Sequence, residues 1–212
     1  MADGRKERKV EKQVKSAALR ANVQRKDLRN KFWIYGTGTF LILVLVVAVT
    51  ISMVGNQNKK ARLTEAANKP IIGVQSFTGL SRNHTSKQVT FPQNPPVGGA
   101  HSAQFINCGI YTQPINSSEA VHSLEHGAVW VTYTPDLPQK QIDSLTKEAA
   151  LHPFELLSPY PGLPSQVVAS AWGKQLQLKS ADDPRLLIFL RKYLQGPQTP
   201  EPGAPCSGGV QG

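Results

Sequence analysis

Two histidines stand four residues apart in the segment AVHSLEHGAVWV, residues 120–131, with a glutamate directly before the second histidine. On a helix, side chains at i and i+4 project from one face with Cβ atoms about 5–6 Å apart, so His122 and His126 could share one metal ion. Glu125, at i+3 from His122, falls on the same side. The segment therefore predicts a metal site with these two histidines as its first candidate ligands.

The same residues also spell H-x-x-E-H, the signature of inverted zincins. In that class two histidines and a distant carboxylate bind zinc, while the glutamate takes a proton from the bound water. Glu125 would then be the catalytic base of a zinc hydrolase. The helix is short, however, and the only nearby candidates for the third ligand are Glu148 and Glu155. We therefore favour a protein without catalytic residues, with the zinc hydrolase as an alternative.

Two further histidines, His84 and His101, lie near the ends of residues 83–104, a stretch rich in Pro, Gly, Asn and Ser. These residue types favour an ordered loop, and proline lowers the entropy that a loop loses when it orders. Imidazole nitrogen binds both zinc and copper(II) well. We predict a zinc or copper site with four ligands: His84, His101, His122 and His126.

A metal-free alternative uses the same residues. The histidines and the glutamate would then form a hydrogen-bonded polar core in a structural or interaction module of the cell envelope. The fifth histidine, His152, precedes a proline at a predicted helix end and is expected to be structural.

Hydrophobic periodicity and turn residues place these side chains on an α+β domain over residues 70–195. Strands are predicted in IIGVQSF, AVWVTYT, FELLS, SQVVASAW and KQLQLK, and helices before Gly127, from Pro138 and from Asp183. This order indicates a small mixed or antiparallel sheet with two or three helices. Residues 196–212 are expected to be extended or disordered unless Cys206 ties them back.

The N-terminal part has a different composition. Residues 32–54 contain no charged side chain and at about 1.5 Å per residue reach about 34 Å, which predicts a single transmembrane helix. Residues 1–31 carry eleven Lys or Arg and four Asp or Glu. The positive-inside rule then predicts a cytoplasmic tail, and residues 55–69 form a polar stalk leading to an extracytoplasmic domain of a single-pass cell-membrane protein.

The distribution of charge along the chain indicates which partners the protein would bind. The formal net charge is +10, and most of it lies in residues 1–31, beside the predicted membrane segment. The lipid bilayer and its anionic headgroups are therefore the expected partners rather than nucleic acid. The sequence does not identify a protein partner in the envelope.

The chain has two cysteines, Cys108 and Cys206. In an oxidising compartment an even number favours a disulfide, which would stabilise a loop of this length by about 4–5 kcal/mol in the chain-entropy model. Cys108 could instead give a thiolate ligand to a metal. The residues alone leave both possibilities open.

Several longer motifs occur in order: NPPVGGAH, INCGIY, AVHSLEHGAVWVTY, SPYPGLPSQVVASAWG and GPQTPEPGAPC. Together they resemble a bacterial envelope family, domain of unknown function number 3105, which is common in actinobacteria. The resemblance covers roughly residues 70–208. It implies a single-pass membrane protein with an extracytoplasmic domain, places the family's motif histidines and cysteines on the residues discussed above, and implies no activity.

Overall fold

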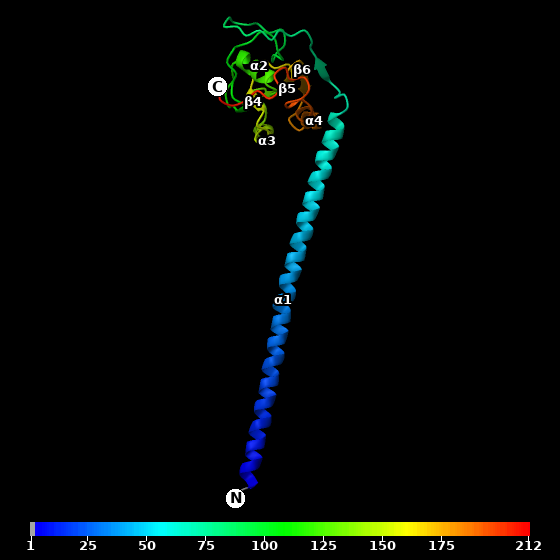
Figure 1. Cartoon of the computed structure of the whole chain (residues 1–212), viewed down its shortest axis with the longest axis vertical. Helices are drawn as coiled ribbons and strands as arrows, with labels where there is room; N and C mark the ends of the chain where they lie inside the picture. Colours follow the sequence, from blue (N-terminus) through cyan, green and yellow to red (C-terminus); the bar gives the residue numbers. More distant parts are fainter. Residues whose placement is uncertain (1–2) are drawn as a thin grey trace. The chain divides into compact units, whose positions relative to one another are not determined.

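The computed structural model describes residues 3–212, so Met1 and Ala2 of the predicted cytoplasmic tail lie outside the described residues. The chain divides into two units, Met1–Lys59 and Lys60–Gly212 (Figure 1). The elements are, in order, α1 (Asp3–Ala67), β1 (Val74–Ser76), β2 (Gly109–Ile110), α2 (Ser117–Glu125), β3 (Val129–Tyr133), α3 (Gln139–Ala149), β4 (Glu155–Pro159), β5 (Val167–Ala171), β6 (Lys174–Leu178) and α4 (Pro184–Tyr193).

The long helix α1 accounts for the described part of the first unit. It spans 65 residues and includes both the predicted transmembrane segment 32–54 and most of the predicted stalk. Over the part of the chain that the structure describes, no helix is both long enough and apolar enough to cross a membrane. The predicted transmembrane helix is therefore not supported, although the segment is helical as expected.

The second unit is built on one mixed sheet of six strands in the order β1-β6-β5-β3-β4-β2. Strands β3 and β4 are parallel, and helix α3 makes the crossover that a parallel pair needs. The β5 strand pairs antiparallel with both β3 and β6, and β2 pairs in parallel with β4 at the edge. The predicted α+β domain is thus confirmed: of the two sheet types that the sequence left open, mixed and antiparallel, the structure has the mixed one, with α2, α3 and α4 as the helices.

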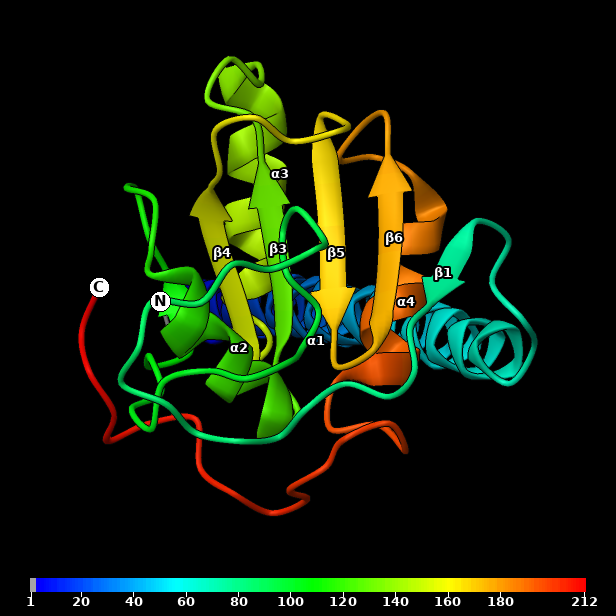
Figure 2. The ribbon, with the colours of Figure 1, turned by 90° about the horizontal axis from the view of Figure 1, so that it is seen from above.

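The sheet separates two apolar cores, because successive side chains of a strand point to opposite faces. One core joins Leu145 of α3 and Phe189 of α4 to alternate residues of the central strands. The other joins Leu124 of α2 to Trp130 and Trp172. Figure 2 shows α3 and α4 behind the strands and α2 on the near side. The candidate site therefore belongs to the α2 face.

The C-terminal residues pack back onto the domain. Cys206 forms a disulfide with Cys108, and the backbone N–H of Cys108 donates to the carbonyl of Cys206 at 2.8 Å. A short parallel bridge between Ile106 and Val210 continues this contact. The predicted disulfide is therefore present, and Cys108 is not free to give a metal a thiolate. The tail is held in place, as expected if Cys206 ties it back.

Candidate metal centre

Helix α2 carries three candidate residues into the protein interior. It begins after Asn116, whose side chain accepts hydrogen bonds from backbone N–H groups of the first turn that have no partner within the helix. Downstream, the residues His122, Glu125 and His126 are exposed by only 6 %, 1 % and 5 %.

The end of α2 is set by Gly127. Its φ of +99° suits glycine, and a Cβ at this position would lie 3.1 Å from the Cα of Gln195. The next residue, Ala128, donates its backbone N–H to the carbonyl of Ser123 and leads directly into β3. The close packing of Gly127 thus fixes the direction in which the last turn of α2 presents Glu125 and His126.

The loop before α2 brings in His84 and His101. These two residues form an isolated parallel bridge. The N–H of Thr85 donates to the carbonyl of His101 at 2.7 Å, and the N–H of His101 donates to the carbonyl of Asn83 at 3.1 Å. The two ends of the loop are therefore held together, and the rings of His84 and His101 lie 4.9 Å apart at their centroids.

Three of the imidazole rings are anchored in the same way. In each ring Nδ1 is close to a backbone carbonyl: His101 to Gly99 at 2.7 Å, His122 to Ser102 at 2.8 Å, and His126 to Pro205 at 2.7 Å. A carbonyl can only accept, so each Nδ1 carries the proton and each neutral ring keeps its lone pair on Nε2. Metal-binding histidines commonly have this arrangement.

Four side chains converge on one point, and we call them the four-residue cluster: His84, His101, His122 and Glu125. One ligand atom from each lies within 4.8 Å of all the others. The Oε2 atom of Glu125 is 2.9 Å from Nε2 of His101 and 3.6 Å from Nε2 of His84. Zinc–ligand bonds of about 2.0–2.1 Å place the ligand atoms of a tetrahedral site about 3.3 Å apart. A shared ion therefore requires Glu125 and His101 to separate slightly and the more distant ligand atoms to move closer.

Two atoms of this cluster are buried without a hydrogen-bond partner. They are Nε2 of His101 and Oε2 of Glu125. Although they lie 2.9 Å apart, no hydrogen bond joins them, which agrees with the proton of His101 being on Nδ1. Two buried electron-pair donors facing each other are unfavourable unless a proton or a metal ion lies between them. The residues therefore fit a metal ion.

Arg82 holds the other oxygen of Glu125. Its Nε donates to Oε1 at 2.9 Å, while its Nη2 donates to the carbonyl of Pro200 at 3.3 Å. This contact fixes the carboxylate so that Oε2 faces the histidines, and it offsets part of the cost of burying a negative charge. Glu125 is thus placed as a ligand with a charged partner behind it.

A second set of side chains adjoins the first, and we call it the three-residue cluster: His122, His126 and Glu201. Their ligand atoms also lie within 4.8 Å of one another. The Oε2 atom of Glu201 is 3.6 Å from Nε2 of His126, and the rings of His122 and His126 are 4.6 Å apart at their centroids. His122 belongs to both clusters.

The electrostatics of His122 favour metal binding. Its pKa is lowered, chiefly because burial penalises the charged ring, and the neighbouring histidines lower it further against the raising effect of the Ser102 carbonyl. A lowered pKa keeps the ring neutral at physiological pH, and only the neutral ring can give a lone pair to a metal.

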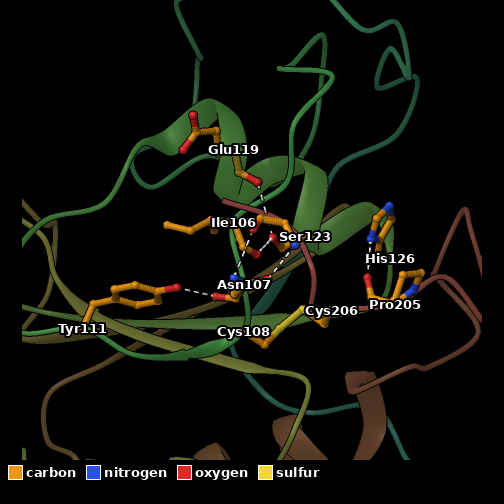
Figure 3. Close-up of a disulfide and its surroundings, with 10 residues drawn as sticks. Ile106, Asn107, Cys108, Tyr111, Glu119, Ser123, His126, Pro205 and Cys206 are labelled. Carbon is orange, nitrogen blue, oxygen red and sulfur yellow. Dashed lines mark hydrogen bonds between the residues drawn. A yellow bond between two sulfur atoms is a disulfide. The ribbon is translucent and has the colours of Figure 1, made fainter. Parts of the chain in front are cut away.

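The Cys108–Cys206 disulfide lies next to the backbone that orients His126. Figure 3 shows Cys108 and Cys206 bonded close to the end of α2, with Nδ1 of His126 directed at the carbonyl of Pro205. Pro205 directly precedes Cys206, so the disulfide fixes the carbonyl that orients His126. The same tail segment carries Glu201, whose N–H donates to the carbonyl of Glu125 at 3.0 Å.

The structure therefore distributes the predicted ligands over two clusters. His84, His101 and His122 come together with Glu125, which the sequence suggested as the base of a hydrolase or as part of a polar core. His126 lies in the three-residue cluster instead. Glu148 and Glu155, considered as third ligands for a zincin-type site, are in neither cluster. His152 pairs with Glu148 at 3.1 Å, away from both, as a structural residue would.

Sequence reasoning missed Arg82 and Glu201. Glu201 stands five residues before Cys206, within the motif GPQTPEPGAPC, so pairing of the cysteines would have directed attention to it. Arg82 stands two residues before His84 and gave no separate signal. The carbonyls of Gly99, Ser102 and Pro205 carry no signature in a sequence at all.

The fold and site define a class: an α+β domain, braced by one disulfide, with a buried histidine and glutamate cluster. Residues 83–208 match the family described as Protein of unknown function (DUF3105), and the chain belongs to that family. The match contains every residue of both clusters, and Arg82 lies just outside it. No curated protein and no solved structure matches the chain.

Proposed function

We propose that this protein binds a single transition-metal ion in the four-residue cluster. One observation carries the proposal: Nε2 of His101 and Oε2 of Glu125 face each other in the interior, 2.9 Å apart, without a hydrogen bond. A cation between them would satisfy both atoms. The carbonyls that hold Nδ1 of His101 and His122 support the proposal, because they direct both lone pairs inward.

The donor set favours zinc, with copper(II) as the second ion to test. Three imidazoles and one carboxylate suit both ions, and the cluster contains no thiolate or thioether that would select copper(I). Four protein ligands also complete the tetrahedral shell that is typical of structural zinc sites, whereas catalytic sites keep one position open. We therefore propose a site that holds an ion rather than one that hydrolyses a substrate.

The role of Glu125 also argues against the hydrolase alternative. A general base needs a carboxylate that is free to take a proton. Here Arg82 holds Oε1, and Oε2 faces His101 and His84. These contacts hold both carboxylate oxygens in place, as expected of a fixed ligand.

We further propose that the domain works in an oxidising, extracytoplasmic compartment. The Cys108–Cys206 disulfide supports this location, because such bonds persist outside the cytosol and are rare within it. Labelling of free thiols in intact cells and in lysates tests it. A reduced pair of cysteines in freshly lysed cells would overturn the proposal.

Metal content tests the proposed site. The full chain, purified without a histidine tag or chelator, is expected to retain about one equivalent of metal by inductively coupled plasma mass spectrometry. His101→Gln should abolish retention. His152→Gln is the matched control and should retain the ion, since His152 lies outside both clusters. A wild-type protein that stays metal-free after equilibration with zinc and with copper(II) would leave the metal-free envelope module as the better hypothesis.

A further inference from the structure

The two clusters share His122, and this sharing limits what they can bind. His122 has two ring nitrogens, and Nδ1 is committed to the carbonyl of Ser102 at 2.8 Å. Only Nε2 remains, and it has one lone pair. His122 can therefore complete the four-residue cluster or the three-residue cluster, but not both at once.

The clusters differ in how firmly they would hold an ion. The four-residue cluster offers one more ligand and contains the two buried atoms without partners. The three-residue cluster ends in Glu201, whose side chain is 40 % exposed and whose Oε2 lies 3.6 Å from His126. An ion bound there has fewer protein ligands and is open to solvent through Glu201. It should leave more readily than an ion in the four-residue cluster.

Arg82 links the carboxylates of both clusters. Its guanidinium contacts Oε1 of Glu125 at 2.9 Å and Oε1 of Glu201 at 3.7 Å. In each carboxylate the other oxygen, Oε2, is the one that lies near a histidine Nε2. The guanidinium of Arg82 thus orients the carboxylates of Glu125 and Glu201 toward the histidines of the two clusters.

From this geometry we infer that His122, His126 and Glu201 form a loading site for a divalent transition-metal ion. The ion binds first to His126, Glu201 and His122, and then moves to His84, His101 and Glu125 while His122 stays bound. The ring of His122 lies 4.6 Å from that of His126 and 5.0 Å from that of His101, centroid to centroid, so the transfer is short. This inference rests on the proposed metal site and adds a path to it.

A loading site has a kinetic signature that a resident ligand lacks. The ion passes through the three-residue cluster both when it enters and when it leaves. Removing that cluster therefore slows association and dissociation together and leaves the dissociation constant of the four-residue cluster nearly unchanged. Loss of a resident ligand instead raises the dissociation rate. Sites lined by charge of one sign raise the association rates of oppositely charged ligands by about 10-fold or more.

Stopped-flow measurements on the full-length apo-protein test the inference. Zinc is followed with a fluorescent indicator, which also gives the dissociation constant by competition. Glu201→Gln should slow association and dissociation by about 10-fold each, with the dissociation constant within about 3-fold of wild type. Asp182→Asn is the matched control, because it removes an exposed carboxylate that lies two residues before α4, on the opposite face of the sheet.

Three results would overturn the inference. Faster dissociation with unchanged association would make Glu201 a resident ligand, and unchanged rates would leave it without a role in binding. Two zinc ions per wild-type chain would show that the clusters fill independently. Each of these leaves the proposed metal site standing. Failure of wild type to bind zinc or copper(II) at all would instead remove the site and the path together.

Discussion

Oε2 of Glu125 lies 2.9 Å from Nε2 of His101, both are buried, and no hydrogen bond joins them. Without a proton or a metal ion between them this pair is a destabilising element, since each atom has lost water without gaining a hydrogen bond. The nearby His84 and His122 add two more nitrogen donors within reach of the same point. A site of this kind should make the stability of the fold depend on the ion.

Zinc should therefore stabilise the wild-type protein. At a free concentration of 100 times the dissociation constant, the free energy of unfolding should rise by about 2.7 kcal/mol. Glu125→Gln should reduce that gain to less than about 1 kcal/mol, because it removes the only anionic ligand of the four-residue cluster. Urea titrations with and without zinc measure both values.

A neighbouring glutamate provides the control for this prediction. Glu119→Gln changes the same side chain on the same helix, outside both clusters. It should leave the zinc-dependent gain unchanged. Equal gains in wild type and Glu125→Gln would contradict a role for Glu125 in binding the ion.

Arg82→Gln should weaken metal binding without removing a ligand. Arg82 fixes Oε1 of Glu125 at 2.9 Å and leaves Oε2 for the ion. Loss of partners that orient metal ligands commonly costs 10–100-fold in affinity, and we expect an effect of about this size. Competition titrations with a chelator measure it.

Arg191→Gln is the corresponding control, because Arg191 lies on α4 and donates to Thr64. The affinity of the Arg191→Gln protein for zinc should match that of wild type. An Arg82→Gln protein that binds zinc as tightly as wild type would show that Glu125 needs no orienting partner.

Removing the disulfide should destabilise the domain. Cys108 and Cys206 are 98 residues apart in sequence, and cross-linking a loop of about 100 residues stabilises a fold by about 4.7 kcal/mol in the chain-entropy model. The double variant Cys108→Ser/Cys206→Ser should lose a comparable amount in urea titrations. A loss below about 1 kcal/mol would mean that the tail holds its place without the bond.

Glu155 should make stability depend on pH, independently of any metal. It opens β4, is 2 % exposed, and has an Oε2 atom without a hydrogen-bond partner. Burial, and secondarily the charge of Glu148, raise its pKa from 4.5 to about 8. The folded protein therefore favours the protonated carboxyl, whereas the unfolded chain releases that proton near pH 4.5.

The stabilising effect of this proton is complete below pH 4.5 and is lost as the pH rises to about 8. The loss should amount to about 4 kcal/mol across that range. Glu155→Gln should remove this part of the pH dependence and make the variant more stable than wild type at pH 8. The control variant Asp136→Asn, at an exposed position, should keep the pH dependence of wild type. Parallel pH profiles of wild type and Glu155→Gln would contradict the prediction.

The sequence predicted the local parts of this molecule well. The strand at residues 129–133 and the i, i+4 spacing of His122 and His126 depend on short-range geometry, and the structure contains both. The alternation expected of a half-exposed strand is absent, because all five residues of β3 are buried. The strand β2 was missed, because its two residues are too few to show a pattern.

The complete set of ligands in each cluster could not be predicted from short stretches of the sequence. His84 reaches the site through its bridge with His101, and Glu201 reaches it from 76 positions beyond Glu125 through the tail. Such contacts depend on the tertiary fold and leave no periodicity in the chain. The same holds for the carbonyl partners that fix the tautomers of the histidine rings.

The attachment of the tail to α2 also sets an order of events during biosynthesis. Glu201 and the carbonyl that orients His126 come late in the chain, and the disulfide at Cys206 holds them in place. The proposed loading site is therefore finished only after translation has passed these residues and both cysteines have been oxidised. Metal uptake would then mark a chain that has completed its maturation. A refolding time course that follows thiol oxidation and zinc uptake together should show oxidation first, and rapid uptake by the reduced chain would refute this order.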